Sequence, residues 1–128
     1  MATPEDLDRC ARSLPEVSVG PYWGQPAYLV GGKAFVWQRP PRRDEGAIDP
    51  ETGMPFADLI VLRFPERAER EAILATSDPE VVFTIPHFRG GFGVLAHLDR
   101  LSDDLLEELV ERAWLATAPP PVRRRAPG

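Results

Sequence analysis

The chain has 128 residues and a formal net charge of −5, with 20 acidic residues against 15 basic ones. A chain of this length fits one domain that buries roughly two-thirds of its unfolded surface, so a core forms without disulfides or metals. The negative charge argues against a protein that coats duplex DNA, because such proteins bind mainly through basic side chains that release counterions. Cys10 is the single cysteine, and without an apolar leader or a long apolar run the sequence predicts a cytoplasmic protein.

The first expected element is a short helix from Thr3 to Ser13. Thr3 supplies a hydroxyl N-cap and Pro4 occupies the first helical position, both of which are typical of a helix start. Apolar residues then recur at helical spacing on one side, at Leu7, Cys10, Ala11 and Leu14. Cys10 belongs to this stripe, so we interpret it as a small buried hydrophobic residue rather than a reactive thiol.

Strands are expected next, at residues 17–22, 27–30 and 33–38. Gly31-Gly32 separates the last two and predicts a two-residue hairpin turn. Alternation along the second arm places Phe35 and Trp37 on one face, and Ala34 and Val36 on the other. Residues 39–57 contain four prolines and two glycines, which predicts a long loop, either functional or disordered.

In the second half, the apolar run 59–64 predicts a strand, Pro65 begins a helix that runs to about Ala75, and residues 81–85 and 92–98 predict two more strands. One face of the last strand carries Phe92, Val94, Ala96 and Leu98, and the other carries Gly93, Leu95 and His97. Ser102 caps the final helix. That helix has the strongest apolar stripe in the chain, formed by Leu105, Leu106, Leu109, Val110, Ala113 and Trp114.

The overall expectation is a two-layer α+β fold in the order α-β-β-β-α-β-β-α, with an antiparallel sheet and helices mainly on one face. Residues 1–118 form the single domain. Residues 119–128 contain proline and arginine without an apolar pattern, so they are expected to be a disordered tail.

No catalytic or metal-binding constellation is recognisable in the sequence. His87 and His97 have no partner at HExxH or CxxC spacing, and there is no nucleophile elbow, P-loop or Rossmann glycine motif. Glu107, Glu108 and Glu111 are interpreted as the solvated face of the last helix. We therefore expect no enzyme activity, no metal and no cofactor.

Two segments remain as candidate sites. In the turn 84–93, His87 and Arg89 lie among glycines whose backbone N–H groups can approach a phosphate or carboxylate, although an ordinary glycine-rich hairpin has the same composition. Trp23, at a strand boundary, either lines a pocket with them or caps the core. The second segment is the acid-free stretch 33–43, whose basic residues are Lys33, Arg39, Arg42 and Arg43.

Several short motifs resemble the MmcQ/YjbR family over most of residues 1–118. They are Leu14-Pro15-Glu16-Val17, Trp23-Gly24 with Pro26, Gly32-Lys33-Ala34-Phe35, Pro86-His87, Gly93-Val94-Leu95-Ala96-His97-Leu98 and Glu111-Arg112-Ala113-Trp114. The resemblance implies an antiparallel sheet with flanking helices, as in secretion-chaperone-like proteins. It also implies a DNA-binding label with a double-wing arrangement of hairpins, and no known enzyme activity.

Carried onto this chain, the resemblance makes the hairpin 27–38 and the basic residues after it the wing. Lys33, Arg39, Arg42 and Arg43 then contact phosphates, and Arg89 is the next candidate. Two alternatives stay open: a protein-interaction or chaperone-like module that forms a homodimer or captures a peptide, and an anion or small-ligand site formed by Trp23, His87 and Arg89.

Overall fold

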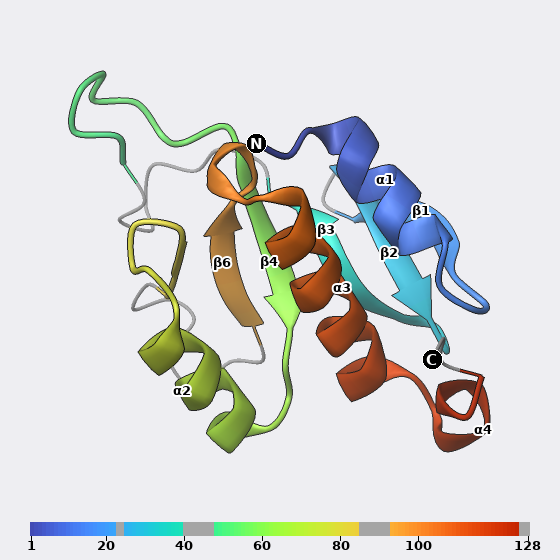
Figure 1. The fold of residues 1–128 in the computed structure, drawn as a ribbon. Coiled ribbons are helices and arrows are strands. Elements are labelled where there is room, and N and C mark those ends of the chain that lie inside the picture. The colour runs from blue at the N-terminus through green and yellow to red at the C-terminus, as the bar shows by residue number, and fades with distance from the viewer. Residues whose placement is uncertain (23–24, 40–47, 85–92, 126–128) are drawn as a thin grey trace.

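The computed structural model describes residues 1–22, 25–39, 48–84 and 93–125 (Figure 1). The elements are α1 (Pro4–Arg12), β1 (Ser18–Tyr22), β2 (Gln25–Val30), β3 (Lys33–Gln38), β4 (Leu59–Arg63), α2 (Arg67–Thr76), β5 (Val82–Phe83), β6 (Gly93–His97), the 3-10 helix η3 (Leu98–Arg100), α3 (Asp103–Thr117) and α4 (Pro120–Arg123). This confirms the α+β class. The strand predicted at 59–64 forms β4, which brings the strands before α2 to four, one more than the summary order α-β-β-β-α-β-β-α counts.

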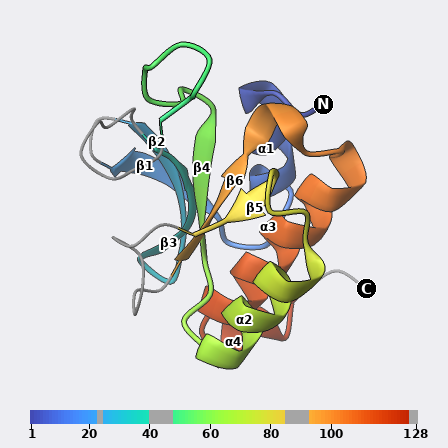
Figure 2. The same cartoon turned by 90° about the vertical axis from the view of Figure 1, so that its left-hand side faces the viewer.

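In the described parts of the chain, six strands form one sheet in the order β1-β2-β3-β4-β6-β5. Every neighbouring pair is antiparallel. Figure 2 shows α1, α2 and α3 together on one side of this sheet, as the sequence predicts. The main core lies between the two layers, because the apolar stripes of the helices face the apolar side of the strands.

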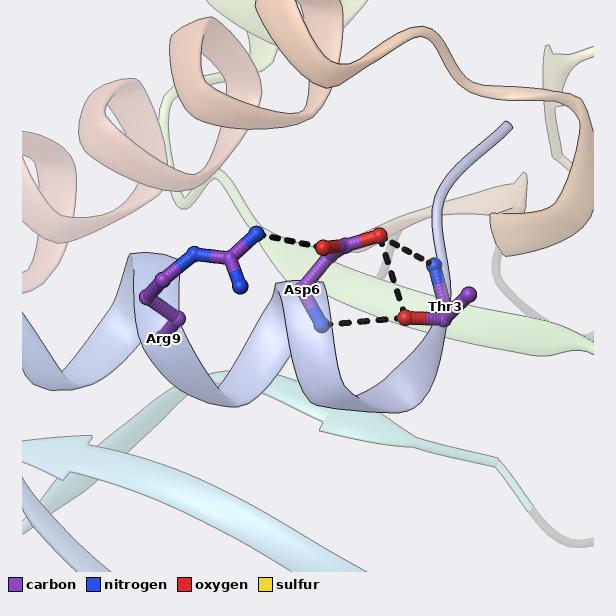
Figure 3. Close-up of polar contacts among 3 residues, drawn as sticks. All are labelled: Thr3, Asp6 and Arg9. Atoms are coloured by element: carbon purple, nitrogen blue, oxygen red, sulfur yellow. Dashed lines mark hydrogen bonds and ion pairs between the residues drawn. The ribbon is translucent and has the colours of Figure 1, made fainter.

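The cap of α1 forms as the residue types predict. The Thr3 hydroxyl accepts a hydrogen bond from the Asp6 backbone N–H, and the Asp6 carboxylate accepts one from the Thr3 backbone N–H (Figure 3). Arg9 donates to the same carboxylate. The bond from Arg9, followed by those from Thr3, holds the pKa of Asp6 below its usual range.

A β-bulge overturns the expected alternation in β3. Tyr28 pairs with Val36 while its neighbour Leu29 pairs with Ala34, so Phe35 has no partner across the strand pair. The extra residue puts the consecutive side chains of Phe35 and Val36 together in the main core, each 0% exposed. The expectation that Phe35 and Trp37 share a face is therefore wrong, because alternation restarts after the bulge.

The β2–β3 turn has the predicted conformation. Gly31 and Gly32 have φ angles of +60° and +80°, the pair of positive values that a type I′ hairpin turn requires. Gly31 also lies directly against the C-terminal segment, since a Cβ atom at this position would be 2.6 Å from Pro119 Cγ. A side chain at residue 31 is therefore excluded by both backbone conformation and space.

The segment after residue 118 differs from the expected disordered tail. Its described part contains α4, which begins with proline at its first position, and Val122 packs against the main core. The apolar contacts of Val122 and Pro119 are too few to form a sequence pattern. They nevertheless dock this segment beside the β2–β3 turn.

We predict that Gly31→Ala destabilises the protein more than Gly32→Ala, by about 1–3 kcal/mol. Both changes strain a left-handed backbone, but a Cβ at residue 32 meets nothing within 4 Å, whereas one at residue 31 collides with Pro119. Urea unfolding measures the difference. Pro119→Ala in the Gly31→Ala background should recover part of the loss, and equal destabilisation by the two glycine variants would contradict the Pro119 contact.

Tyr28 joins the sheet to α1. Its side chain is buried, and its hydroxyl donates to Asp8 Oδ1 over 2.9 Å, while Arg12 donates to the same carboxylate oxygen. Burial first, and the bond to Asp8 second, raise the pKa of Tyr28 to about 12. The hydroxyl therefore stays protonated well beyond the pH at which an exposed tyrosine ionises.

We predict that this tyrosine gives the protein an alkaline stability limit. The unfolded chain ionises Tyr28 near pH 10 and the folded chain near pH 12, so the stabilisation is complete below about pH 10 and is lost as the pH rises to about 12. Urea unfolding across this range should show a steeper loss for the wild type than for Tyr28→Phe. Identical pH dependence in the two proteins would contradict the shifted pKa.

The packing helix α3 matches its prediction most closely. Ser102 caps it by accepting from the Leu105 backbone N–H. Its buried residues, Leu106, Leu109, Val110, Ala113 and Trp114, belong to the predicted stripe. The Trp114 indole N–H donates to the Pro15 carbonyl over 3.1 Å, which ties the end of α3 to the segment that follows α1.

Candidate functional site

The structure describes two of the basic residues predicted to contact phosphates. Lys33 is exposed at the start of β3, whereas Arg39, just past its end, is only 7% exposed, and its backbone N–H donates to the Leu59 carbonyl. Six residue steps at ~3.3 Å each separate their Cα atoms by about 20 Å. Lys33 and Arg39 are therefore not neighbours, and only Lys33 presents its side chain to solvent.

Five other predicted site residues lie outside the described residues. They are Trp23, Arg42, Arg43, His87 and Arg89. The ligand pocket and the basic loop accordingly stay predictions from the sequence.

A different group of basic residues lies near Lys33. Because Gly31 contacts Pro119, the β2–β3 turn that precedes Lys33 lies beside the segment that contains α4 and the two residues after it, and Arg123, Arg124 and Arg125 there are all exposed. We call these four residues, Lys33 and Arg123 to Arg125, the turn patch. The arginine run is visible in the sequence, but its position beside a turn some 90 residues earlier is not.

The turn patch is only partly neutralised. Arg125 Nη1 is 3.2 Å from a Glu16 carboxylate oxygen, and Arg123 donates to the Ala118 carbonyl, which leaves its charge unbalanced. Within the described part of the chain, neither Lys33 nor Arg124 makes an ion pair. The patch thus retains three positive charges without an acidic partner in the described chain, those of Lys33, Arg123 and Arg124.

The other face of the sheet contains an aspartate–histidine pair that local spacing did not reveal. His97 Nδ1 lies 3.0 and 3.1 Å from the two carboxylate oxygens of Asp58, which is 39 residues earlier. The imidazole stacks on Phe83 at 5.2 Å between ring centroids, and meets Phe56 edge-on at 4.5 Å. His97 is 4% exposed.

Strand register explains how this pair forms. His97 ends β6 opposite Leu59, the first residue of β4, so Asp58 is one residue away from the cross-strand partner. The Arg100 guanidinium lies 5.8 Å from the Phe56 ring centroid and adds a cation–π contact. Together these contacts hold Phe56 and Asp58, at the end of the long loop, against the sheet.

We predict that Asp58 and His97 are energetically coupled. Asp58→Ala leaves the buried imidazole nitrogen without its partner, which costs stability beyond the lost contact itself. The two single substitutions together should therefore destabilise the protein more than the double substitution does. A double-mutant cycle with Asp58→Ala and His97→Ala, measured by urea unfolding, should give a coupling of about 1–3 kcal/mol. Strict additivity would contradict the contact.

A groove of about 400 Å³ lies between α1 and α3. Its lining residues are Asp6, Arg9, Cys10, Ser13, Leu14, Asp103, Leu106, Glu107, Val110 and Glu111. We call it the acidic groove, because its floor is apolar and its rim carries four carboxylates against one arginine. Burial first, then Glu107, raises the pKa of the Cys10 thiol, which keeps this sulfur protonated rather than nucleophilic.

The acids of α3 are not neutralised within the described chain. Asp103, Asp104, Glu107, Glu108 and Glu111 make no ion pair there, since Arg112 pairs with Glu69 of α2 instead. Like charges four residues apart on a helix destabilise it by about 0.2–0.5 kcal/mol per pair. A second hollow, of about 370 Å³, continues along α3 from the acidic groove and shares Glu107 and Glu111 with it.

Across residues 1–22, 25–39, 48–84 and 93–125, no three histidine, cysteine or carboxylate side chains converge as a metal site would need. None of the described helices is both long and apolar enough to cross a membrane.

The antiparallel sheet, with its helices on one side and a buried polar pair on the other, defines a small α+β protein. The model of the YjbR family matches residues 12–116. Uncharacterized proteins of Mycobacterium bovis and of two strains of Mycobacterium tuberculosis are 34% identical over 122 residues, which span 93% of this chain and 91% of each relative. The chain therefore belongs to the YjbR family. No solved structure matches it.

Proposed function

We propose that this YjbR-family protein binds nucleic acid weakly, through phosphate contacts made by the turn patch. The observation that carries the proposal is the contact of Gly31 with Pro119, which places Lys33 of a hairpin beside three exposed arginines. Arginine and lysine side chains on a fixed backbone are suited to phosphate contacts. The type I′ turn defines the backbone here, because both of its glycines have positive φ values.

The net charge of −5 is compatible with this proposal because the acids at the start of α3 lie at a distance from the turn patch. Asp103 and Asp104 start α3, and α4 follows its other end, 15 residues later. A helix of that length spans about 22 Å. This exceeds the Debye length of about 8–10 Å at physiological ionic strength, so Asp103 and Asp104 barely weaken phosphate binding at the patch, whereas Glu111, about 9 Å from the end of α3, weakens it in part.

Weak binding is expected because few cations take part. Three phosphate contacts predict a slope of about −2.7 for the logarithm of the association constant against the logarithm of salt concentration on duplex DNA. The patch contains no aromatic side chain to stack on bases. We therefore expect little preference for sequence, since phosphate contacts carry no sequence information.

We predict that the variant Lys33→Ala/Arg123→Ala/Arg124→Ala loses most binding to duplex and single-stranded DNA in fluorescence anisotropy titrations at low salt. Its control is Arg9→Ala/Arg12→Ala/Arg67→Ala, which removes the same charge from exposed ion pairs on α1 and α2. The control should bind like the wild type. No binding by the wild type at low salt, or an equal loss in both variants, would refute the proposal.

A second variant, Arg42→Ala/Arg43→Ala, separates the turn patch from the basic loop predicted by the sequence. If both variants weaken binding, the interface extends from the hairpin turn to the loop. If only the loop variant does so, nucleic acid binds elsewhere, and the turn patch is not the interface.

A further inference from the structure

Two oppositely charged surfaces lie at opposite ends of α3. The acidic groove and the other α3 acids occupy its first three turns, and the turn patch follows its C-terminal end. Figure 1 looks onto the helix layer and shows the first half of α3 beside α1, with α4 beyond its last turn on the same side of the molecule. Both surfaces are therefore open to one partner that approaches the helix layer.

The two surfaces cannot neutralise each other within one chain. Asp103 is separated from the end of α3 by about 22 Å of helix, and Glu111, the nearest of the acids, by about 9 Å. The turn patch is also held where it is, because Pro119 lies against Gly31 and Val122 packs into the main core. The acids of α3 make no ion pair in the described chain, and in the turn patch only Arg125 does, with Glu16, so most of the charge on both surfaces is uncompensated.

We propose that the acidic groove is a docking surface for a second copy of this chain, which inserts the arginines of its turn patch between α1 and α3. With the two α3 helices antiparallel, the basic end of each lies against the acidic end of the other. A two-fold axis then makes both contacts at once, as a closed dimer requires. The half-buried Cys10 in the floor of the groove provides apolar contact for the aliphatic stems of the arginines.

The charges make this dimer sensitive to salt. Its polar contacts are mostly between exposed groups, whose interactions salt screens. We expect a dimer at low ionic strength that dissociates as salt rises. A strand-mediated or apolar dimer would persist or strengthen instead.

Sedimentation velocity at low and high salt tests the proposal with two charge-reversed variants. Glu107→Lys/Glu111→Lys reverses the groove, and Arg123→Glu/Arg124→Glu reverses the patch, so each should be monomeric at concentrations where the wild type is dimeric. Mixed in equal amounts, they should form a heterodimer, because the lysine groove meets the glutamate patch and the unaltered groove meets the unaltered patch. The control Glu66→Lys/Glu71→Lys makes the same charge change at two exposed residues, the N-cap residue of α2 and a residue within it, and should dimerise like the wild type.

A wild-type protein that stays monomeric at low salt, reversed variants that still dimerise, or a mixture that remains monomeric would each overturn the proposal. Circular dichroism of each variant checks that the fold persists. The experiment contains no nucleic acid, and the groove variant leaves the turn patch intact. Its failure is therefore distinct from a failure of nucleic-acid binding.

Discussion

The indole of Trp114 is 0% exposed between α3 and the sheet, and its N–H donates to the Pro15 carbonyl 3.1 Å away. This contact fixes three parts of the chain at once. It packs α3 against the sheet, and it holds the connection from α1 to β1. The end of α3 is fixed with it, because the backbone N–H of the buried Ala118 donates to the Trp114 carbonyl. Pro119 then reaches Gly31, so the position of the β2–β3 turn also depends on where α3 ends.

This arrangement changes the meaning of the net charge. Averaged over the chain, the acids exceed the bases and argue against a polyanionic partner. In the fold, acids of α3 collect at one end of the helix layer and the turn patch forms at the other. The protein therefore carries a charge asymmetry along α3 that a single net value conceals.

Local sequence patterns predicted those features that depend on neighbouring residues. The Thr3 cap, the glycine turn, the two faces of β6 and the stripe of α3 are all confirmed. The bulge at Phe35 was not predictable, because strand register is decided by the partner strand. Asp58 and His97, 39 residues apart, were also missed, since only the pairing of β4 with β6 brings them together.

The candidate site was predicted less well than the fold, for the same physical reason. A run of basic residues shows that charge is available, but burial decides which side chains reach solvent. Lys33, the first residue of β3, is exposed, whereas Arg39, just after its last residue, is buried. Arg124 becomes relevant only because Pro119 and Val122 dock α4, and these two residues form no periodic pattern.

The strand order has a consequence for the behaviour of the protein at high concentration. The sheet edges are β1 and β5, and an exposed edge usually offers unpaired N–H and C=O groups to which another chain can add. Here β5 has only two residues, and β1 contains Pro21, which has no N–H to donate. Neither edge is a good template for strand addition, so the sheet resists the edge-to-edge growth that leads to aggregates.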